Sequence, residues 1–269
     1  IRRQRQMCIR DRDNHRVKKG SRVYWRGRLP LMSGEAYELV VAQAPDVASI
    51  DAALLTSDLL HHWSPGAALM VGIAASTKPG EVKLGDVVIG SEVFYYERGK
   101  ITHEGKVPEP KMVQADATLW SNVTTLPNWT PTLHILRPDG TTDRPKLHFG
   151  VIASGEKVLA DEVVRDQIAS GHRKILAIEM EGYSFSKAVL QSFDRVRHLV
   201  IRGICGDGSA AKDDKWHQYA AASVAGFARR ARTARRQPGR RPAYGAAGAV
   251  RAAHLRGQCR ARRRGRPPQ

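Results

Sequence analysis

Two carboxylates flank a single methionine in the stretch LAIEMEGYSF, where an apolar, strand-like run is followed by helix-like sequence. Glu179 and Glu181 are thus placed close to buried backbone, where a charge is costly unless it is paired or used. One explanation for an acid here is structural. A carboxylate at the start of a helix is stabilised by the helix macrodipole, but only by about 0.3–1 kcal/mol. The other explanation is that one of the two acids faces a ligand.

The middle of the chain alternates between strand-like and helix-like segments. Continuous apolar runs of the buried-strand type are separated by segments with apolar residues at helical spacing. The expected strands are 36–43, 67–76, 85–101, 147–158, 174–180 and 197–205, and the expected helices are 46–63, 113–124, 160–171, 181–193 and 213–231. This alternation predicts βαβ units. The fold class expected is therefore α/β, a three-layer αβα arrangement with a central mixed, largely parallel twisted sheet.

Small or polar residues gather at four of the predicted strand ends. In folds of this class, ligands bind at the carboxyl ends of the strands. Four such ends together are a stronger indication of a binding site than any one of them alone. The four segments are 72–76, 154–159, 179–181 and 202–207.

The formal net charge of +18 is typical of a nucleic-acid binder, but the charge is confined to the two ends of the chain. Residues 1–30 carry a net +9 and residues 229–269 a net +14, which leaves 31–228 at −5. Nucleic-acid binding is therefore expected only if the Arg-rich tail is native. The middle has no spacing of cysteine or histidine typical of a metal site, and no apolar run approaching the ~20 residues of a membrane span. We expect a cytoplasmic protein without metal or cofactor.

Both ends differ in composition from the middle. The stretch QMCIRDR matches a conceptual translation of a transposon end used in preparing sequencing libraries, so residues 1–21 are interpreted as a non-native or disordered segment. Residues 229–269 are interpreted either as a disordered basic arm or as a frameshifted reading of the gene. The domain itself is placed at 22–228.

Five segments in the middle of the chain, VGIAAS, KLGDVVIGSEV, IASGEKVLAD, AIEMEG and LVIRGIC, resemble in their order and spacing the nucleoside phosphorylase and methylthioadenosine/S-adenosylhomocysteine nucleosidase superfamily. The stretches YELVVAQAPD and KDDKWHQYAA are similar to phosphorylase-type domains attached to fungal and bacterial signalling or defence proteins. The resemblance implies a purine nucleoside ligand, cleavage of its N-glycosidic bond, no cofactor, and an assembly that can be a homo-oligomer.

The resemblance also implies roles for individual residues. Glu181 would accept hydrogen bonds from both ribose hydroxyls and stabilise the ribosyl cation, Met180 would pack on the sugar, and Glu179 would serve the fold. The residues implied for the base pocket are Ser154, Val158 and Leu159, and those implied for the nucleophile pocket are Gly72, Ala74 and Ala75. For Val158 and Leu159, packing in the core is an equal alternative. No arginine precedes Gly72, which favours water over phosphate as the nucleophile.

Two departures from the family pattern affect the expected activity. The family's general acid follows R-x-I-[SC], where this chain has Gly206, with an acid one step later. We assign the acid to Asp207, whose pKa would have to be raised by burial, although Gly-Asp-Gly is also an ordinary turn sequence. In addition, nothing before residue 24 matches the family's first βα unit. The chain is therefore interpreted as an N-terminally truncated fragment that turns over slowly even if its parent is an active enzyme.

Three functions are consistent with these residues. The first is hydrolysis of a purine nucleoside or related ligand. The second is phosphate-dependent phosphorolysis of the same bond. The third is a catalytically weakened nucleoside-sensing module of a signalling or defence protein, which Gly206 favours.

Overall fold

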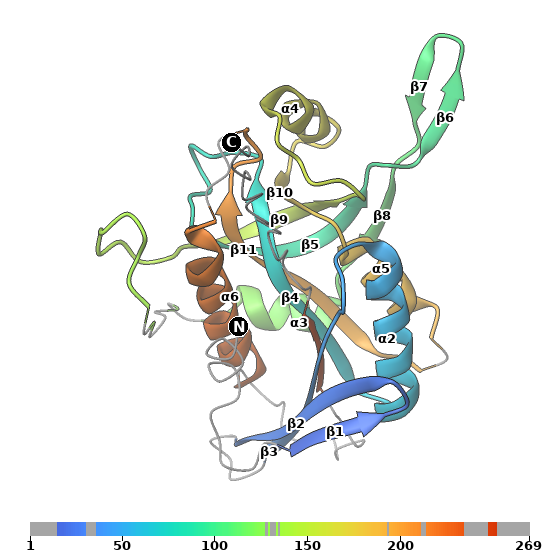
Figure 1. Cartoon of the computed structure of the whole chain (residues 1–269), viewed down its shortest axis with the longest axis vertical. Helices are drawn as coiled ribbons and strands as arrows, with labels where there is room; N and C mark the ends of the chain where they lie inside the picture. The colour runs from blue at the N-terminus through green and yellow to red at the C-terminus, as the bar shows by residue number, and fades with distance from the viewer. Residues whose placement is uncertain are drawn as a thin grey trace, which may run out of the picture.

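The computed structural model describes residues 15–30, 36–126, 129, 133, 135–192, 194–210, 214–233 and 247–251. Its strands are β1 (His15–Lys19), β2 (Arg22–Pro30), β3 (Ala36–Gln43), β4 (Ala67–Ser76), β5 (Val87–Tyr95), β6 (Gly99–Thr102), β7 (Gly105–Pro108), β8 (Lys111–Gln114), β9 (Leu147–Ser154), β10 (Ile175–Glu179), β11 (Arg197–Gly206) and β12 (Ala247–Arg251). Its helices are α2 (Ser49–Trp63), α3 (Ala117–Thr124), α4 (Glu162–Ser170), α5 (Gly182–Leu190) and α6 (Trp216–Thr233) (Figure 1).

Ten strands form one sheet in the order β1-β2-β3-β12-β4-β10-β9-β5-β11, with β8 paired to β5, while β6 and β7 form a hairpin that projects from the body (Figure 1). The sheet is mixed. Strand β4 runs parallel to β11 and β12 but antiparallel to β10, and β5 runs parallel to β9 but antiparallel to β11. The predicted α/β class is confirmed, but the sheet is less parallel than expected. Its strands run antiparallel at the β1–β2, β2–β3, β4–β10, β5–β8 and β5–β11 contacts.

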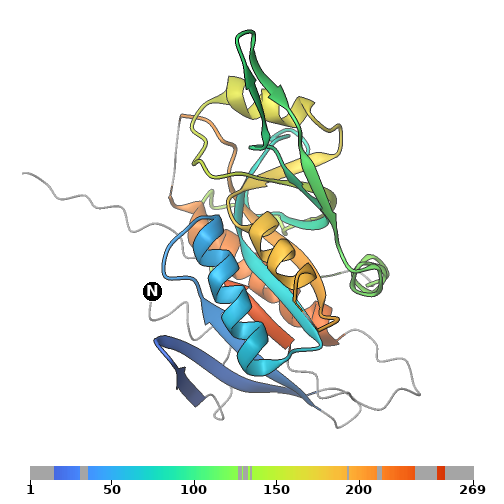
Figure 2. The same ribbon diagram turned by 90° about the vertical axis from the view of Figure 1, so that its right-hand side faces the viewer.

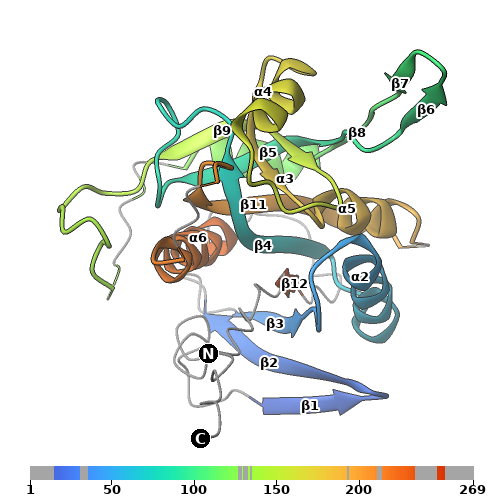
Figure 3. The same cartoon turned by 45° about the horizontal axis from the view of Figure 1, so that its top comes forward.

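Part of the sheet closes on itself. Strand β4 pairs with β11 as well as with β10, so β4, β10, β9, β5 and β11 form a ring. Figure 3 shows the bend in β4 that lets its two halves belong to different parts of the sheet. Closure removes unpaired strand edges in this region, so the strands that carry the candidate site residues support one another.

Helices cover both faces of the sheet. On one face α2 and α5 lie side by side (Figure 2). They cover a buried cluster that includes Leu55, Met70 and Phe185. Helix α6 lies on the other face (Figure 3). Its Phe227 belongs to a buried cluster with Ile201. Burying each such side chain stabilises the fold by roughly 1.5–3 kcal/mol. No helix within the described ranges is long and apolar enough to cross a membrane.

The aspartate of the KLGDVVI motif has a structural role. Asp86 is buried and accepts hydrogen bonds from the backbone N–H groups of Lys83 at 3.0 Å and Lys146 at 2.8 Å, and it lies 2.8 Å from His148 Nε2. Burial alone would raise the pKa of Asp86, but His148 and the two backbone donors together hold it below its ordinary value. The motif therefore fixes the start of β5 to the start of β9.

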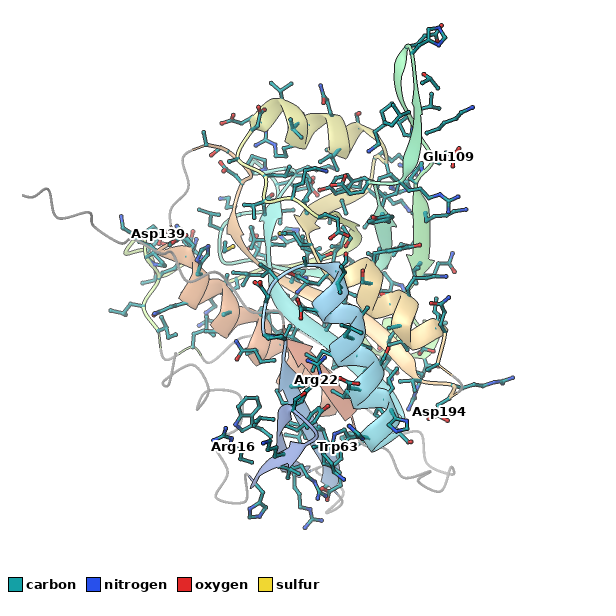
Figure 4. The ribbon with its side chains drawn as sticks, turned by 45° about the vertical axis from the view of Figure 1, so that its right-hand side comes forward. Arg16, Arg22, Trp63, Glu109, Asp139 and Asp194 are labelled. Atoms are coloured by element: carbon teal, nitrogen blue, oxygen red, sulfur yellow. The ribbon has the colours of Figure 1, made fainter. Side chains whose placement is uncertain are left out.

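Ordered structure extends beyond the predicted domain at its beginning. Strand β1 lies within the segment 1–21, which the sequence analysis interprets as non-native or disordered, and it pairs with β2 over five residues. The resulting hairpin packs against α2, and Figure 4 shows its Arg22 and the Trp63 of that helix. Arg22 forms an ion pair with Asp58. The Nζ atom of Lys19 lies 5.6 Å from the centroid of the Trp63 ring. These contacts explain why the hairpin is ordered, whereas residues 1–14 lie outside the described residues.

Ordered structure also extends into the tail 229–269. Helix α6 continues to Thr233, and β12 runs parallel to both β3 and β4, with Ala249 opposite Val41 and Leu69. The backbone of β12 thus forms hydrogen bonds with the facing edges of two strands. The rest of the tail lies outside the described residues.

The helix expected at 113–124 is shorter than predicted. Residues 111–114 instead form β8, which pairs with β5, and α3 begins after Asp116, whose side chain accepts the Leu119 N–H. Pairing with a neighbouring strand, which is distant in sequence, overrides the local helical pattern here.

Candidate active site

The AIEMEG motif forms the junction between β10 and α5. The strand ends at Glu179, whose carboxylate accepts hydrogen bonds from the backbone N–H groups of Glu181 at 3.0 Å and Gly182 at 2.9 Å. A Cβ at position 182 would lie 2.8 Å from Glu179 Oε1, which explains the glycine. Glu179 therefore satisfies the first free N–H groups of α5, in agreement with its expected role in the fold.

A fully buried arginine joins the two acids. Arg202 Nη2 donates to Glu179 and also lies 3.2 Å from Glu181 Oε2 and 3.3 Å from Met70 Sδ. The Nε and Nη1 atoms of Arg202 are buried too, and they have no hydrogen-bond partner among the described residues. Buried donors are rarely left unpaired in proteins, so two unused donors beside two carboxylates indicate a place where a ligand or water binds.

Glu181 is the acid that responds to pH in the neutral range. Burial raises the pKa of Glu181 to about 7, because the attraction of Arg202 only partly offsets the loss of water and the repulsion from Glu179. Only 5% of its side chain is exposed. A buried carboxyl that titrates near neutral pH at a strand end is characteristic of functional sites.

The beginning of α2 lies against this junction. Ser49 Oγ donates to Glu156 and lies 3.5 Å from the carbonyl oxygen of Met180. The preceding residue, Ala48, has φ 112° and ψ 167°, a conformation that residues other than glycine rarely adopt. A backbone hydrogen bond from Ala48 reaches Glu181. The strained residue is thus in contact with the buried acid, which is where strained backbone is commonly found.

We expect Ala48→Gly to raise the free energy of unfolding by about 1 kcal/mol. Relief of roughly 1–3 kcal/mol of backbone strain exceeds the entropic cost of a glycine, which is roughly 0.5–1 kcal/mol. Urea unfolding followed by tryptophan fluorescence measures the change. The matched control is Ala53→Gly inside α2, which is expected to lower stability by about 1 kcal/mol. A loss of stability in both variants would show that Ala48 is not strained.

Strand register brings the residues of the predicted nucleophile pocket toward Arg202. Gly72 on β4 pairs with Arg202 on β11, and Ala75 pairs with Gly206. Ala74 is buried in the cluster beneath α2 and α5. The three small residues therefore lie on the strand beside the arginine, and their contact with a nucleophile remains a prediction.

The residues predicted for the base pocket have different environments. Ser154 is fully buried and its Oγ accepts the Tyr183 N–H at 3.1 Å, which ties β9 to α5. Leu159 packs against the apolar cluster beneath α4, whereas 49% of the Val158 surface is exposed. Ser154 and Leu159 are thus engaged within the fold, and Val158 is the member of the three with apolar surface available to a ligand. A base contact for each remains a prediction.

Asp207 follows β11 and is held by the neighbouring loop and helix. Its Oδ1 accepts the Ser209 N–H at 3.1 Å, and its carbonyl oxygen accepts from Arg165 Nη1 at 2.9 Å. Burial would raise the pKa of Asp207, but the hydrogen bonds from Ser209 and the charge of Arg165 lower it below its ordinary value. This direction is opposite to the one required of a general acid, so a role in proton transfer requires a ligand that alters these contacts. At Gly206 an added Cβ would meet nothing within 4 Å.

Arg202 lies in the predicted segment 202–207 but has no role of its own among the sequence-based predictions, and Ala48 and Ser49 are absent from them. A signal for Arg202 is present, because a charge within the buried run LVIRGIC must pair with an acid. The other two have no comparable signal in the sequence, since their importance arises from the approach of α2 to β10, which are far apart in the chain.

Comparisons with known proteins give the family and the fold. The family model of the phosphorylase superfamily matches residues 6–236. The ATP nucleosidase Cap17 of Escherichia coli is 27% identical over 233 residues, which cover 81% of this chain and 45% of that protein. The 5′-methylthioadenosine/S-adenosylhomocysteine nucleosidase of Maridesulfovibrio salexigens is 25% identical over 66% of this chain and 74% of that protein. The chain thus spans about half the length of the ATP nucleosidase.

Solved structures show the same fold. The 5′-methylthioadenosine/S-adenosylhomocysteine nucleosidase of Neisseria meningitidis, in complex with methylthio-immucillin-A, matches 85% of this chain and 95% of its own, with a TM-score of 0.65 at 19% identity. Futalosine hydrolase of Helicobacter pylori matches 86% of this chain and 93% of its own, with a TM-score of 0.66 at 19% identity. Since the family model covers most of the sequence and the fold agrees, the chain belongs to the phosphorylase superfamily.

Proposed function

We propose that this chain hydrolyses the N-glycosidic bond of a purine nucleoside or a related ligand. The observation that carries the proposal is the buried Glu181, which lies 3.2 Å from Arg202 at the junction of β10 and α5. A carboxylate offers two acceptor oxygens and so suits the two neighbouring hydroxyls of ribose. Relatives whose names describe an ATP nucleosidase and a methylthioadenosine/S-adenosylhomocysteine nucleosidase support this choice.

In the proposed reaction the bond between C1′ and the purine nitrogen breaks, the electron pair leaves with the purine, and water adds to C1′. Ionised Glu181 accepts both ribose hydroxyls and stabilises the positive charge that develops on the sugar, while Met180 packs on the sugar. Arg202 positions Glu181. Once the bound ligand has displaced the contacts of Asp207 with Ser209 and Arg165, Asp207 takes a proton from solvent and donates it to the departing purine, and the attacking water releases a proton to solvent.

Adenine-bearing substrates are the first to test, because both relatives are named for such compounds. Purified protein is incubated with ATP, adenosine and 5′-methylthioadenosine, with and without inorganic phosphate, and the products are separated by liquid chromatography. We expect free adenine at the same rate in both conditions, since no arginine precedes Gly72 to hold phosphate. Formation of ribose 1-phosphate only when phosphate is present would establish phosphorolysis instead.

A nucleoside-sensing module is the second candidate. Gly206 stands where the family's acid is expected, and the pKa of Asp207 is lowered rather than raised. Calorimetric binding of adenosine without release of adenine would establish this function. Turnover that is lost in Asp207→Asn while adenosine binding is kept would exclude it.

A homo-oligomer remains a prediction from the resemblance, and a cytoplasmic location remains an expectation from the composition of the sequence. Nucleic-acid binding depends on the Arg-rich tail, most of which lies outside the described residues. If the tail binds nucleic acid, the affinity falls steeply with salt and is lost when residues 229–269 are removed.

A further inference from the structure

Both carboxylate oxygens of Glu97, which follows β5, are engaged by one loop. Oε1 accepts the backbone N–H of Glu156 at 3.3 Å, and Oε2 accepts from Lys157 Nζ at 2.6 Å. Only 13% of the Glu97 side chain is exposed, compared with 70% for Lys157. The acid is therefore held in place while it fixes the middle of the loop 154–159.

The same loop reaches the proposed ribose site. Glu156 accepts a hydrogen bond from Ser49 Oγ, which also lies 3.5 Å from the carbonyl oxygen of Met180. Met180 stands between the two buried acids of the AIEMEG motif. A continuous path of polar contacts thus runs from Glu97 through the loop and the start of α2 to that motif.

The two ends of the loop have anchors of their own. The Gly155 N–H donates to the carbonyl oxygen of Glu179 at 3.0 Å, and Leu159 packs against the apolar cluster beneath α4. Residues 156–158 lie between these anchors, and Val158 leaves about half of its surface exposed. The conformation of this central stretch therefore depends on the side chains that reach it from outside the loop.

We infer that Glu97 is a positioning residue that presets the loop 154–159 to receive a purine. The inference rests on the proposed function, because it takes this loop as a wall of the base pocket. A loop that is already ordered spares the ligand the entropic cost of ordering it, which favours binding more than the chemical step. Loss of Glu97 should therefore weaken affinity and leave the rate of bond cleavage nearly intact.

Three substitutions separate the contacts that Glu97 makes. Glu97→Ala removes both, and we expect KM for adenosine and Kd for adenine to rise about 10-fold or more, with kcat changed by less than about 3-fold. Glu97→Gln keeps an acceptor for the Glu156 N–H but loses the ion pair, so its KM and Kd should fall between those of wild type and Glu97→Ala. Lys157→Met, which removes the same ion pair, should match Glu97→Gln.

Glu109→Gln is the matched control. Glu109 lies at the base of the β6–β7 hairpin, where Arg98 Nε is 3.7 Å from its carboxylate and both side chains are about half exposed (Figure 4). Removing this ion pair changes the local charge in the same way without touching the loop. We expect KM and Kd of this variant to equal those of wild type.

Hydrogen exchange of the loop 154–159, measured by mass spectrometry without ligand, gives a readout that does not depend on turnover. We expect faster exchange at 156–158 in Glu97→Ala, with thermal unfolding shifted by no more than a few degrees. Unchanged KM, Kd and exchange in this variant would overturn the inference. A wild-type protein that neither binds adenine nor releases it would overturn the proposed function, and the exchange measurement would still decide whether Glu97 orders the loop.

Discussion

Glu181→Gln is expected to lower kcat/KM for adenosine by about 10²-fold to 10³-fold at pH 8, without lowering the stability of the protein. The amide keeps the shape of the side chain but loses the charge and one of the two acceptors for the ribose hydroxyls. Hydrogen bonds to a charged group contribute roughly 1.5–3 kcal/mol each. Loss of one such bond and weakening of the other together correspond to this loss in kcat/KM. Steady-state release of adenine measures the activity, and urea unfolding measures the stability.

In the wild-type protein, the contribution of Glu181 to stability should depend on pH in the opposite sense to that of an acid whose pKa is lowered on folding. The pKa of Glu181 is about 7 in the folded protein and 4.5 in the unfolded chain, so between these values only the folded protein holds the proton. The stability that this group contributes is therefore complete below pH 4.5 and is lost as the pH rises to about 7. Glutamine cannot titrate. The free energy of unfolding of Glu181→Gln, relative to that of wild type, should therefore rise by about 3 kcal/mol between pH 4.5 and 8.

Glu179→Gln serves as the control within the same motif. Glu179 accepts two backbone N–H groups and pairs with the buried Arg202, so its loss leaves a buried cation with weaker compensation. We expect this variant to lose roughly 3 kcal/mol of stability. If Glu181→Gln lost as much stability as Glu179→Gln, or kept wild-type turnover, Glu181 would be a structural acid.

Asp207→Asn is expected to reduce kcat for adenosine by about 100-fold, because proton donation to a leaving group contributes roughly 10²-fold to 10⁴-fold. Adenosine binding should remain within about 3-fold of wild type. The sharper test uses p-nitrophenyl β-D-ribofuranoside, whose leaving group departs without protonation. We expect Asp207→Asn to cleave this substrate at nearly the wild-type rate, and an equal loss with both substrates would show that Asp207 is not the acid.

A carboxyl group placed one residue earlier provides the complementary test. Gly206 pairs with Ala75 at the end of β11, and an added Cβ there would meet nothing within 4 Å, so Gly206→Asp should fold normally. In the double variant Gly206→Asp, Asp207→Asn, we expect kcat for adenosine to recover at least 10-fold relative to Asp207→Asn alone. No recovery would mean that position 206 does not face the departing base.

Local patterns were sufficient to predict the central strands and most of the helices. The strands 36–43 and 67–76 have the bounds that their apolar runs indicate, and the position of AIEMEG at a strand end follows from a charge that interrupts such a run. These features depend on residues that are neighbours in the chain. The hydrophobic pattern therefore predicts them without knowledge of the tertiary structure.

The features that the sequence analysis missed all depend on contacts between distant segments. The pairing of β12 with β3 and β4 joins residues about two hundred positions apart, and nothing in its short run of small residues indicates a partner. The strain at Ala48 arises only when α2, β10 and β11 meet, and so do the two Arg202 donors that have no partner in the described part of the chain. At these positions the tertiary structure determines the local chemistry.

The ring of β4, β10, β9, β5 and β11 also determines how the protein can move. Glu179, Arg202 and Gly72 all lie on strands of this ring, so rigid-body rotation of two lobes cannot separate them. Exchange of ligand must therefore depend on the loops at the strand ends, whose motions last nanoseconds to microseconds. The strands β1, β2 and β3 lie outside the ring, but Tyr24 and Val40 belong to the same buried cluster as Met70 on β4, so we expect these strands to unfold together with the ring.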